Sequence, residues 1–217
     1  SVLFTLKIFI VFLAGMIDYL LFKGSVLEGP ALELSLPFNT GTYFTAQGGD
    51  FPLLNFHNSN PTQRYSTEIT RVNSLGFRAA GLLPSDPDSY IIWHDTVVAP
   101  CNAKVIAVTA NLPDMPLDSL DEDNPDGNNI VLEYSGCLIM LAHLATGTIK
   151  AKPGDTLKTG QVIGLVGKSG NSSEPLLGIH AVQGTAPDNI LRGEGVPMRF
   201  NGKFLIRNEA IEAGQKP

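Results

Sequence analysis

"TGQVIGLVGKSGNSSEPLLGIHAVQ", residues 159–183, is the stretch that decides the fold of this chain. Two apolar runs, 162–166 and 177–182, flank a turn rich in glycine and serine, which is typical of short strands. Side chains two residues apart on a strand share a face. Leu176, Gly178 and His180 therefore lie on one face, where a single histidine stands beside a glycine and a leucine.

Short apolar runs divided by turn signals continue along the whole chain after Lys23. Their β-branched content predicts an all-β domain. Strands are expected at residues 31–36, 42–46, 66–72, 96–98, 103–109, 130–134, 137–143, 148–151, 162–166, 177–182 and 204–206. The acidic, proline-rich segment 111–128 is predicted to be a solvated loop. Gly-Lys-Ser at 167–169 lacks the context of a phosphate-binding loop, so we interpret it as a turn.

The N-terminal stretch, residues 2–22, is apolar and about long enough to cross a bilayer as a helix. Lys7 and Asp18 interrupt it near its ends, where their polar groups approach the lipid headgroups. We predict a transmembrane anchor at residues 1–23, inserted in the lipid bilayer through residues 2–22, in preference to a buried apolar helix. Residues 24–50 are then a connecting segment with the first strands, and residues 51–217 form the main domain.

The composition narrows the class of protein. Hydrophobic residues make up 43% of the chain and charged residues 17%, which is typical of a globular protein. The net charge of -6 and the lack of a Lys/Arg cluster exclude a general nucleic-acid-binding protein. Cys101 and Cys137 form no Cys-x-x-Cys pair, which excludes a cysteine zinc site. They are either two buried thiols or one disulfide, depending on the compartment.

Three segments, in order, resemble the lysostaphin-type, LytM-like zinc metallopeptidases. Residues 142–175 are similar to that family's core, in which His-Leu is followed by Gly-Asp, Gly-Gln-x-Ile-Gly, Gly-x-Ser/Thr-Gly and a Pro-His-Leu-His strand. Residues 97–108 resemble its Ala-Pro strand, and residues 55–69 resemble the first metal-ligand segment of one branch. The resemblance implies a LytM-like antiparallel β-sheet domain with a groove over its central sheet.

The resemblance also implies which residues belong to the site. The family holds a catalytic zinc with a His and an Asp of the first segment and the second His of His-Leu-His, which leaves one position for water. His57 matches the first ligand, and Glu68 stands where the Asp is expected, with a longer side chain. His143 matches the histidine of His-Leu, which the family uses for proton transfer.

Leu176 and Gly178 depart from the family pattern. Leu176 replaces the first histidine of His-Leu-His, and Gly178 replaces the zinc-ligand histidine. Leucine cannot move a proton and glycine has no side-chain donor atom. The resemblance therefore predicts a degenerate member without catalytic residues, in which His143 and Leu176 are relic positions. We expect no metal at the positions of His57, Glu68 and Gly178, and no other cofactor.

His180 leaves an alternative open. It lies two residues, about 6.6 Å, beyond the lost ligand position. With His57 and Glu68 it would form a relocated zinc site, which requires a rebuilt groove because metal ligands tolerate little displacement. Zinc is a cofactor only under this alternative. In the preferred interpretation these histidines are relics that are hydrogen-bonded in or near an apolar groove.

The sequence thus predicts a catalytically inactive, membrane-anchored, peptidase-like protein that acts as an accessory subunit, scaffold or regulator in a membrane or envelope assembly. Its expected partners are other membrane or envelope proteins, with peptidoglycan as a further candidate. The expected location is a bacterial inner membrane, single-pass, with the β-domain in the periplasm, where a Cys101–Cys137 disulfide is expected. The alternatives are a zinc-dependent cell-wall endopeptidase with the relocated site and a peptidoglycan-binding module.

Overall fold

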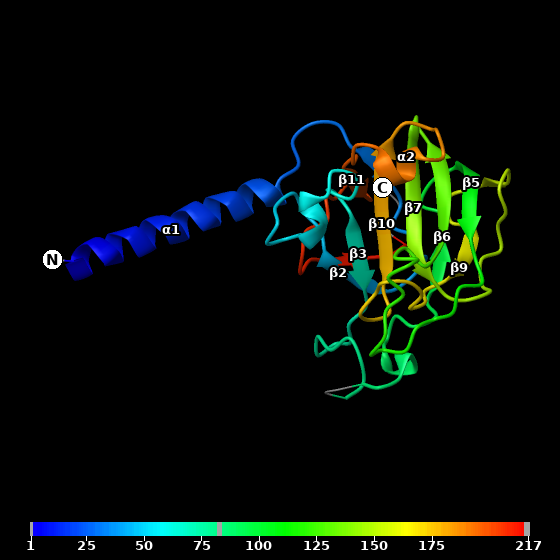
Figure 1. The fold of residues 1–217 in the computed structure, drawn as a ribbon, viewed down its shortest axis with the longest axis horizontal. Coiled ribbons are helices and arrows are strands. Elements are labelled where there is room, and N and C mark those ends of the chain that lie inside the picture. The colour runs from blue at the N-terminus through cyan, green and yellow to red at the C-terminus, as the bar shows by residue number, and fades with distance from the viewer. Residues whose placement is uncertain (1, 82–83, 215–217) are drawn as a thin grey trace.

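A long N-terminal helix projects from a β-domain in the computed structural model, which describes residues 2–81 and 84–214 (Figure 1). Helix α1 spans Val2–Ser25, so it ends after the predicted anchor of residues 1–23. Ser1, the first residue of that anchor, lies outside the described residues. The helix is long and apolar enough to cross a membrane, and its most apolar window is 0% buried inside the protein. The prediction of one N-terminal apolar helix before a mostly-β domain is confirmed.

The segment after α1 is held against the β-domain. The amide of Asp50 donates to the carbonyl of Gly24 at 2.7 Å. A β carbon on Gly24 would lie 2.3 Å from Cβ of Phe51, so only glycine fits this contact. Further along, the guanidinium of Arg199 donates to the carbonyls of Leu27 and Gly29. The start of the connection is therefore hydrogen-bonded to the β-domain at Gly24, Leu27 and Gly29.

The strands form one large sheet and two small ones across the described residues. The large sheet contains β2 (Thr42–Gln47), β3 (Thr67–Thr70), β5 (Ala103–Thr109), β6 (Asn128–Tyr134), β7 (Cys137–Leu144), β8 (Thr156–Leu157), β10 (Leu177–Gln183) and β12 (Ala210–Glu212). Its order is β12-β2-β3-β10-β7-β6-β5-β8, with antiparallel pairing throughout. In the small sheets, β1 (Leu32–Leu34) pairs with β11 (Met198–Phe200) in parallel, and β4 (Thr96–Val98) pairs with β9 (Val162–Leu165) antiparallel.

Strand β10 separates the two faces of the large sheet by its alternation. Leu177, Ile179 and Ala181 point into the main core, together with the apolar residues of β1, β4 and β11. Val182 points to the opposite face, which carries a smaller apolar cluster beneath the short helix α2 (Asn189–Arg192). Gly178 and His180 share this opposite face, so the candidate site lies outside the main core.

Several predicted boundaries differ from the structure. Residues 148–151 and 204–206 are not strands, although Ile149, Ala151 and Leu205 contact the core as expected of apolar residues. The short strands β8, β11 and β12 were not predicted, and neither were the 3-10 helices η1 (Phe56–Ser59) and η2 (Pro87–Ser89). Strand β2 pairs with β3 and β12, so a division at residue 51 separates strands of one sheet. Residues 215–217, the end of the predicted domain, lie outside the described residues.

Candidate functional site

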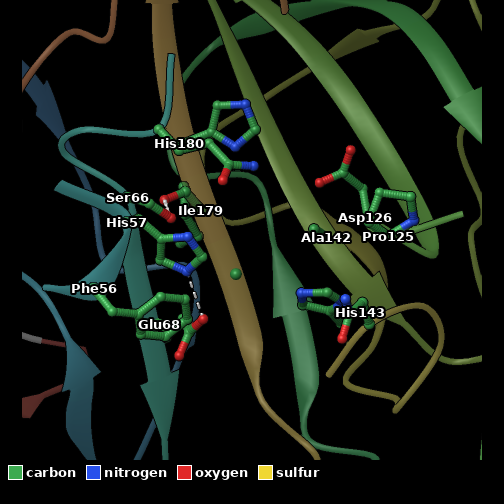
Figure 2. Close-up of a pocket in the computed structure, with 13 residues that line it drawn as sticks. Phe56, His57, Ser66, Glu68, Pro125, Asp126, Ala142, His143, Ile179 and His180 are labelled. Carbon is green, nitrogen blue, oxygen red and sulfur yellow. Dashed lines mark hydrogen bonds and ion pairs between the residues drawn. The ribbon is translucent and has the colours of Figure 1, made fainter. Parts of the chain in front are cut away.

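The pairing of β10 with both neighbours places the candidate site at Gly178. Gly178 lies opposite Glu68 of β3 and opposite Ala142 of β7. The three strands form the floor of a cavity of about 250 Å³. His57, Glu68, His143, Gly178 and His180 all line this cavity (Figure 2). The structure therefore brings together the residues that the sequence assigned to the site, except Leu176.

His57 and Glu68 form a hydrogen-bonded pair. Nε2 of His57 lies 2.8 Å from Oε1 of Glu68, and both side chains are largely buried. His57 belongs to η1, whose first turn is fixed by Asn55: the side-chain oxygen of Asn55 accepts from the amide of His57. The amide group of the fully buried Asn55 also donates to the carbonyls of Gly49, Arg64 and Ser66. Asn55 thus positions His57, a role that the sequence did not reveal.

His143 is held by its backbone and by its ring. Its φ of 64° is in the left-handed region, which is uncommon for a non-glycine residue. Its amide donates to the carbonyl of Asp126 and its carbonyl accepts from Gly167. In the ring, Nδ1 lies 2.9 Å from the carbonyl oxygen of Ser169, so Nδ1 carries the hydrogen.

The remaining ring nitrogen of His143 faces the cavity as an acceptor. A β carbon on Gly178 would lie 3.4 Å from Nε2 and 3.1 Å from Cδ2 of His143. Burial lowers the pKa of His143, which favours the neutral ring despite the hydrogen bond to Ser169. Nε2 of the neutral ring therefore has a free lone pair directed at the space where Gly178 has no side chain.

Leu176 lies just before β10 and lines a different cavity. Its side chain is buried, and this second cavity of about 260 Å³ shares Phe56, Glu68 and Asn171 with the first. An ion pair between Arg78 and Glu174 borders it. Leu176 thus belongs to the same face as Gly178 but packs as an apolar residue.

His180 is turned toward α2. It is 5% exposed, and its Nε2 lies 3.5 Å from the carbonyl oxygen of Ile190, at the outer limit for a hydrogen bond. Burial lowers the pKa of His180 and favours the neutral ring. Within residues 2–81 and 84–214, His, Cys, Asp and Glu side chains form no group of three or more that could hold a metal ion. The relocated set of His57, Glu68 and His180 is therefore not assembled.

The donor set can be tested against the zinc that the resemblance implies. A catalytic zinc needs three protein ligands. His57 and Glu68 occupy two of the expected positions, and Gly178 supplies no donor atom at the third. The residues present do not fit a catalytic zinc of the expected kind.

The acidic loop 111–128 forms the wall of the cavity opposite His57, through Pro125 and Asp126 (Figure 2). The turn around Lys168 holds this loop in place, although from the sequence Gly-Lys-Ser at 167–169 is interpreted only as a turn between strands. Lys168 is 0% exposed, and its ammonium donates to the carbonyls of Pro116 at 2.7 Å and Ser119 at 2.9 Å. The amide of Asn171 donates to the carbonyl of Pro125. The loop therefore forms a wall of the cavity. Several of its charged residues are exposed, as predicted for a solvated loop, but hydrogen bonds to Lys168 and Asn171 hold part of it against the domain.

Cys101 and Cys137 are both buried in the main core cluster, where they are free thiols. Of the two alternatives, the structure contains two buried thiols, and it does not contain the predicted Cys101–Cys137 disulfide. Burial raises the pKa of Cys101 to about 12 and also raises the pKa of Cys137. Buried thiols of this kind react slowly, because the thiolate is the reactive form.

This chain is similar to several solved structures of other proteins. No protein-family model matches the chain, and no curated protein matches it. A zinc-containing peptidase from Vibrio cholerae is similar at 18% identity and a TM-score of 0.42, over 87% of this chain and 40% of that chain. The M23 metalloprotease pseudoalterin from the deep sea is similar at 14% identity and a TM-score of 0.45, over 84% and 99% of the two chains.

A third similar structure is the SpoIIQ-SpoIIIAH pore-forming complex, at 13% identity and a TM-score of 0.42, over 77% of this chain and 89% of that chain. This chain spans less than half the length of the Vibrio cholerae peptidase chain. Identities and scores of this size leave the interpretation of the site to its own residues and distances.

Proposed function

We propose that this protein is a catalytically inactive, membrane-anchored, peptidase-like protein that serves as an accessory subunit, scaffold or regulator in a membrane or envelope assembly. The single observation that carries the proposal is Gly178. It lies between Glu68 and the acceptor nitrogen of His143, where a third metal ligand is required, and it has no side chain. Without that ligand, no group in the cavity activates water as the zinc of a peptidase does.

The other parts of the site support a binding role. The cavity keeps a fixed wall, a fixed His57–Glu68 pair and a fixed His143 ring, each with named hydrogen bonds. Such a preorganised concave surface suits recognition of a partner segment. The exposed apolar residues of α1 suit insertion in a bilayer, since burying apolar side chains in lipid is favourable. The proposed location is a bacterial inner membrane with the β-domain in the periplasm.

Metal analysis of the purified full chain tests the proposal. The expected zinc content is far below one ion per chain, with no hydrolysis of cell-wall peptides after zinc is added. Stoichiometric zinc that is lost in His57→Ala or in His180→Ala would instead show a zinc-dependent endopeptidase with a relocated site. Binding to purified peptidoglycan, with no larger assembly in native gels of solubilised membranes, would show a peptidoglycan-binding module.

A further inference from the structure

The cavity beside Gly178 contains two carboxylates and a histidine acceptor among its lining residues. Glu68 contributes a carboxylate, one oxygen of which is bonded to His57, and Asp126 contributes a second carboxylate from the loop wall. Nε2 of the neutral His143 ring is a third acceptor, because Nδ1 carries the hydrogen. Figure 2 shows Glu68 and His57 on one side of β10, and His143 and Asp126 on the other.

No lysine or arginine lines this cavity among the described residues. Glu68 also lines the adjoining cavity, which Arg78 and Arg207 line, whereas Asp126 lines, of these two, only the cavity beside Gly178. A carboxylate that is partly removed from water is unfavourable until a positive group approaches. The space for that group is open, because Gly178 places no side chain between Glu68 and His143. The cavity is therefore suited to a cationic donor that enters from outside.

We propose that the cavity binds the side-chain ammonium of a lysine that a partner polypeptide inserts beside Gly178. An ammonium has three N–H donors, and the cavity offers it the carboxylate of Glu68 on one side and, on the other, the carboxylate of Asp126 and the Nε2 acceptor of His143. The ammonium of lysine is a compact charge whose three donors rotate toward separate acceptors, whereas the guanidinium of arginine holds its donors in a rigid planar fork. The inference rests on the proposed function, since a metal-loaded site would repel this group.

The second cavity indicates which type of residue lies near that lysine in the partner segment. It continues from the first along β10, from Gly178 to Leu176, a step of about 6.6 Å. Its apolar part is formed by Phe56, 61% exposed, Leu120, 45% exposed, and the buried Leu176. The rest of its lining is mainly polar and includes Arg207 and the Arg78–Glu174 ion pair. In an extended chain, side chains two residues apart have the same spacing and face the same side.

The apolar part of this lining, Phe56, Leu120 and Leu176, favours a large apolar side chain two residues from the lysine in the partner segment. This expectation favours a protein over the cell wall. A cell-wall peptide with a diamino acid supplies the amine without the large apolar side chain.

Binding of short peptides to the full chain in detergent, with a metal chelator present, tests the inference. The probes are acetyl-Leu-Ala-Lys-amide and acetyl-Lys-Ala-Leu-amide, each compared with the same peptide carrying Nε-acetyl-lysine. At least one lysine peptide should bind about tenfold or more tightly than its acetylated form, because a charge-assisted hydrogen bond is lost. The His143 ring signals in NMR spectra should shift with the same affinity.

Two variants of the protein locate the binding. Asp126→Asn and Glu68→Gln should each reduce the affinity for the lysine peptide several-fold and leave the acetylated peptide unchanged. Asp123→Asn is the matched control, since Asp123 is an exposed carboxylate of the same loop that does not line the cavity. Thermal melting confirms that each variant is folded.

Equal binding of the lysine and acetyl-lysine peptides would overturn the inference. A cell-wall peptide with a diamino acid that binds more tightly than either lysine peptide would also overturn it, by assigning the cavity to the cell wall. Stoichiometric zinc in the protein purified without chelator would contradict the proposed function itself. Absence of zinc together with no preference for lysine would contradict this inference alone.

Discussion

Gly178 of β10 lies directly opposite Glu68 of β3, and a β carbon at Gly178 would contact the ring of His143 on the other side. The backbone thus keeps a ligand position in register with a carboxylate and a histidine, while the residue there has no donor atom. Under the proposed function, catalysis is absent because of the side chains at positions 176 and 178 and not because of the fold around them.

The double substitution Gly178→His with Leu176→His should restore zinc binding. The new side chain at 178 starts between Glu68 and His143, so it joins His57 and Glu68 as the third ligand. We expect a Kd of about 1 μM or tighter, which corresponds to about 8 kcal/mol. Competition with a chromogenic chelator measures it.

Gly178→Ala with Leu176→His is the control, because alanine supplies the β carbon that contacts His143 without a ligand. If the folded double-histidine variant binds zinc no better than this control, the site is not in register and the argument from Gly178 fails.

Replacing Lys168 with methionine should destabilise the protein and release the acidic loop. The carbonyls of Pro116 and Ser119 lose their charged donor. A hydrogen bond to a charged group contributes about 2 kcal/mol to stability. We expect a lower thermal midpoint and faster proteolysis within residues 111–128. Lys152→Met, at an exposed lysine, should change neither quantity, and an unchanged cleavage rate in Lys168→Met would show that the loop is held by other contacts.

The stability of the fold should fall as the solution becomes acidic, in part through His143 and His180. Burial lowers both pKa values below the ordinary 6.5, so below that pH the unfolded chain binds protons that the folded chain does not. The contribution of these neutral rings to the free energy of unfolding is therefore fully present above pH 6.5 and decreases as the pH falls below 6.5.

His180→Gln should flatten the decrease in the thermal midpoint between about pH 7.5 and about pH 5, because glutamine does not titrate. His94→Asn, at an exposed histidine with a φ of 62°, is the control that should keep the parent's slope. An identical pH profile for His180→Gln and the parent would indicate that the His180 ring does not contribute.

The state of Cys101 and Cys137 can be determined directly in protein taken from its native compartment. If both remain thiols, the raised pKa values and burial predict slow alkylation by iodoacetamide at neutral pH until the protein is denatured. Denaturation without reductant should then expose two reactive thiols. Thiols that appear only after reduction would establish the disulfide that the sequence analysis predicted.

The sequence predicts most of the fold because its signals are local. The apolar helix and the strands at 96–98 and 103–109 match the structure, since length, alternation and β-branched residues determine them. The short strands β11 and β12 carry no such signal, because they form only where another strand offers backbone partners. Residues 148–151 failed for the opposite reason: their apolar side chains contact the core from an irregular segment.

The sequence predicts those residues of the site that are recognised by their side-chain type and their motif spacing. Motif spacing located His57, Glu68, His143 and Gly178, and the structure joins them in one cavity. The contributions of Asn55 and Lys168 come from hydrogen bonds to backbone carbonyls that are distant in sequence. No pattern in a single sequence reports which carbonyls meet a side chain, so these positioning residues emerge only from the structure.

The fixed connection between Gly24 and Asp50 has a consequence for how a partner arrives. His57 follows Asp50 closely in the chain, so the cavity is tied to the end of α1 without a long flexible segment. With α1 in a bilayer, the cavity stays at a set height above the lipid surface. The proposed partner, if it is fixed in the same membrane, would then meet the cavity at a raised effective concentration, which strengthens binding without any new contact.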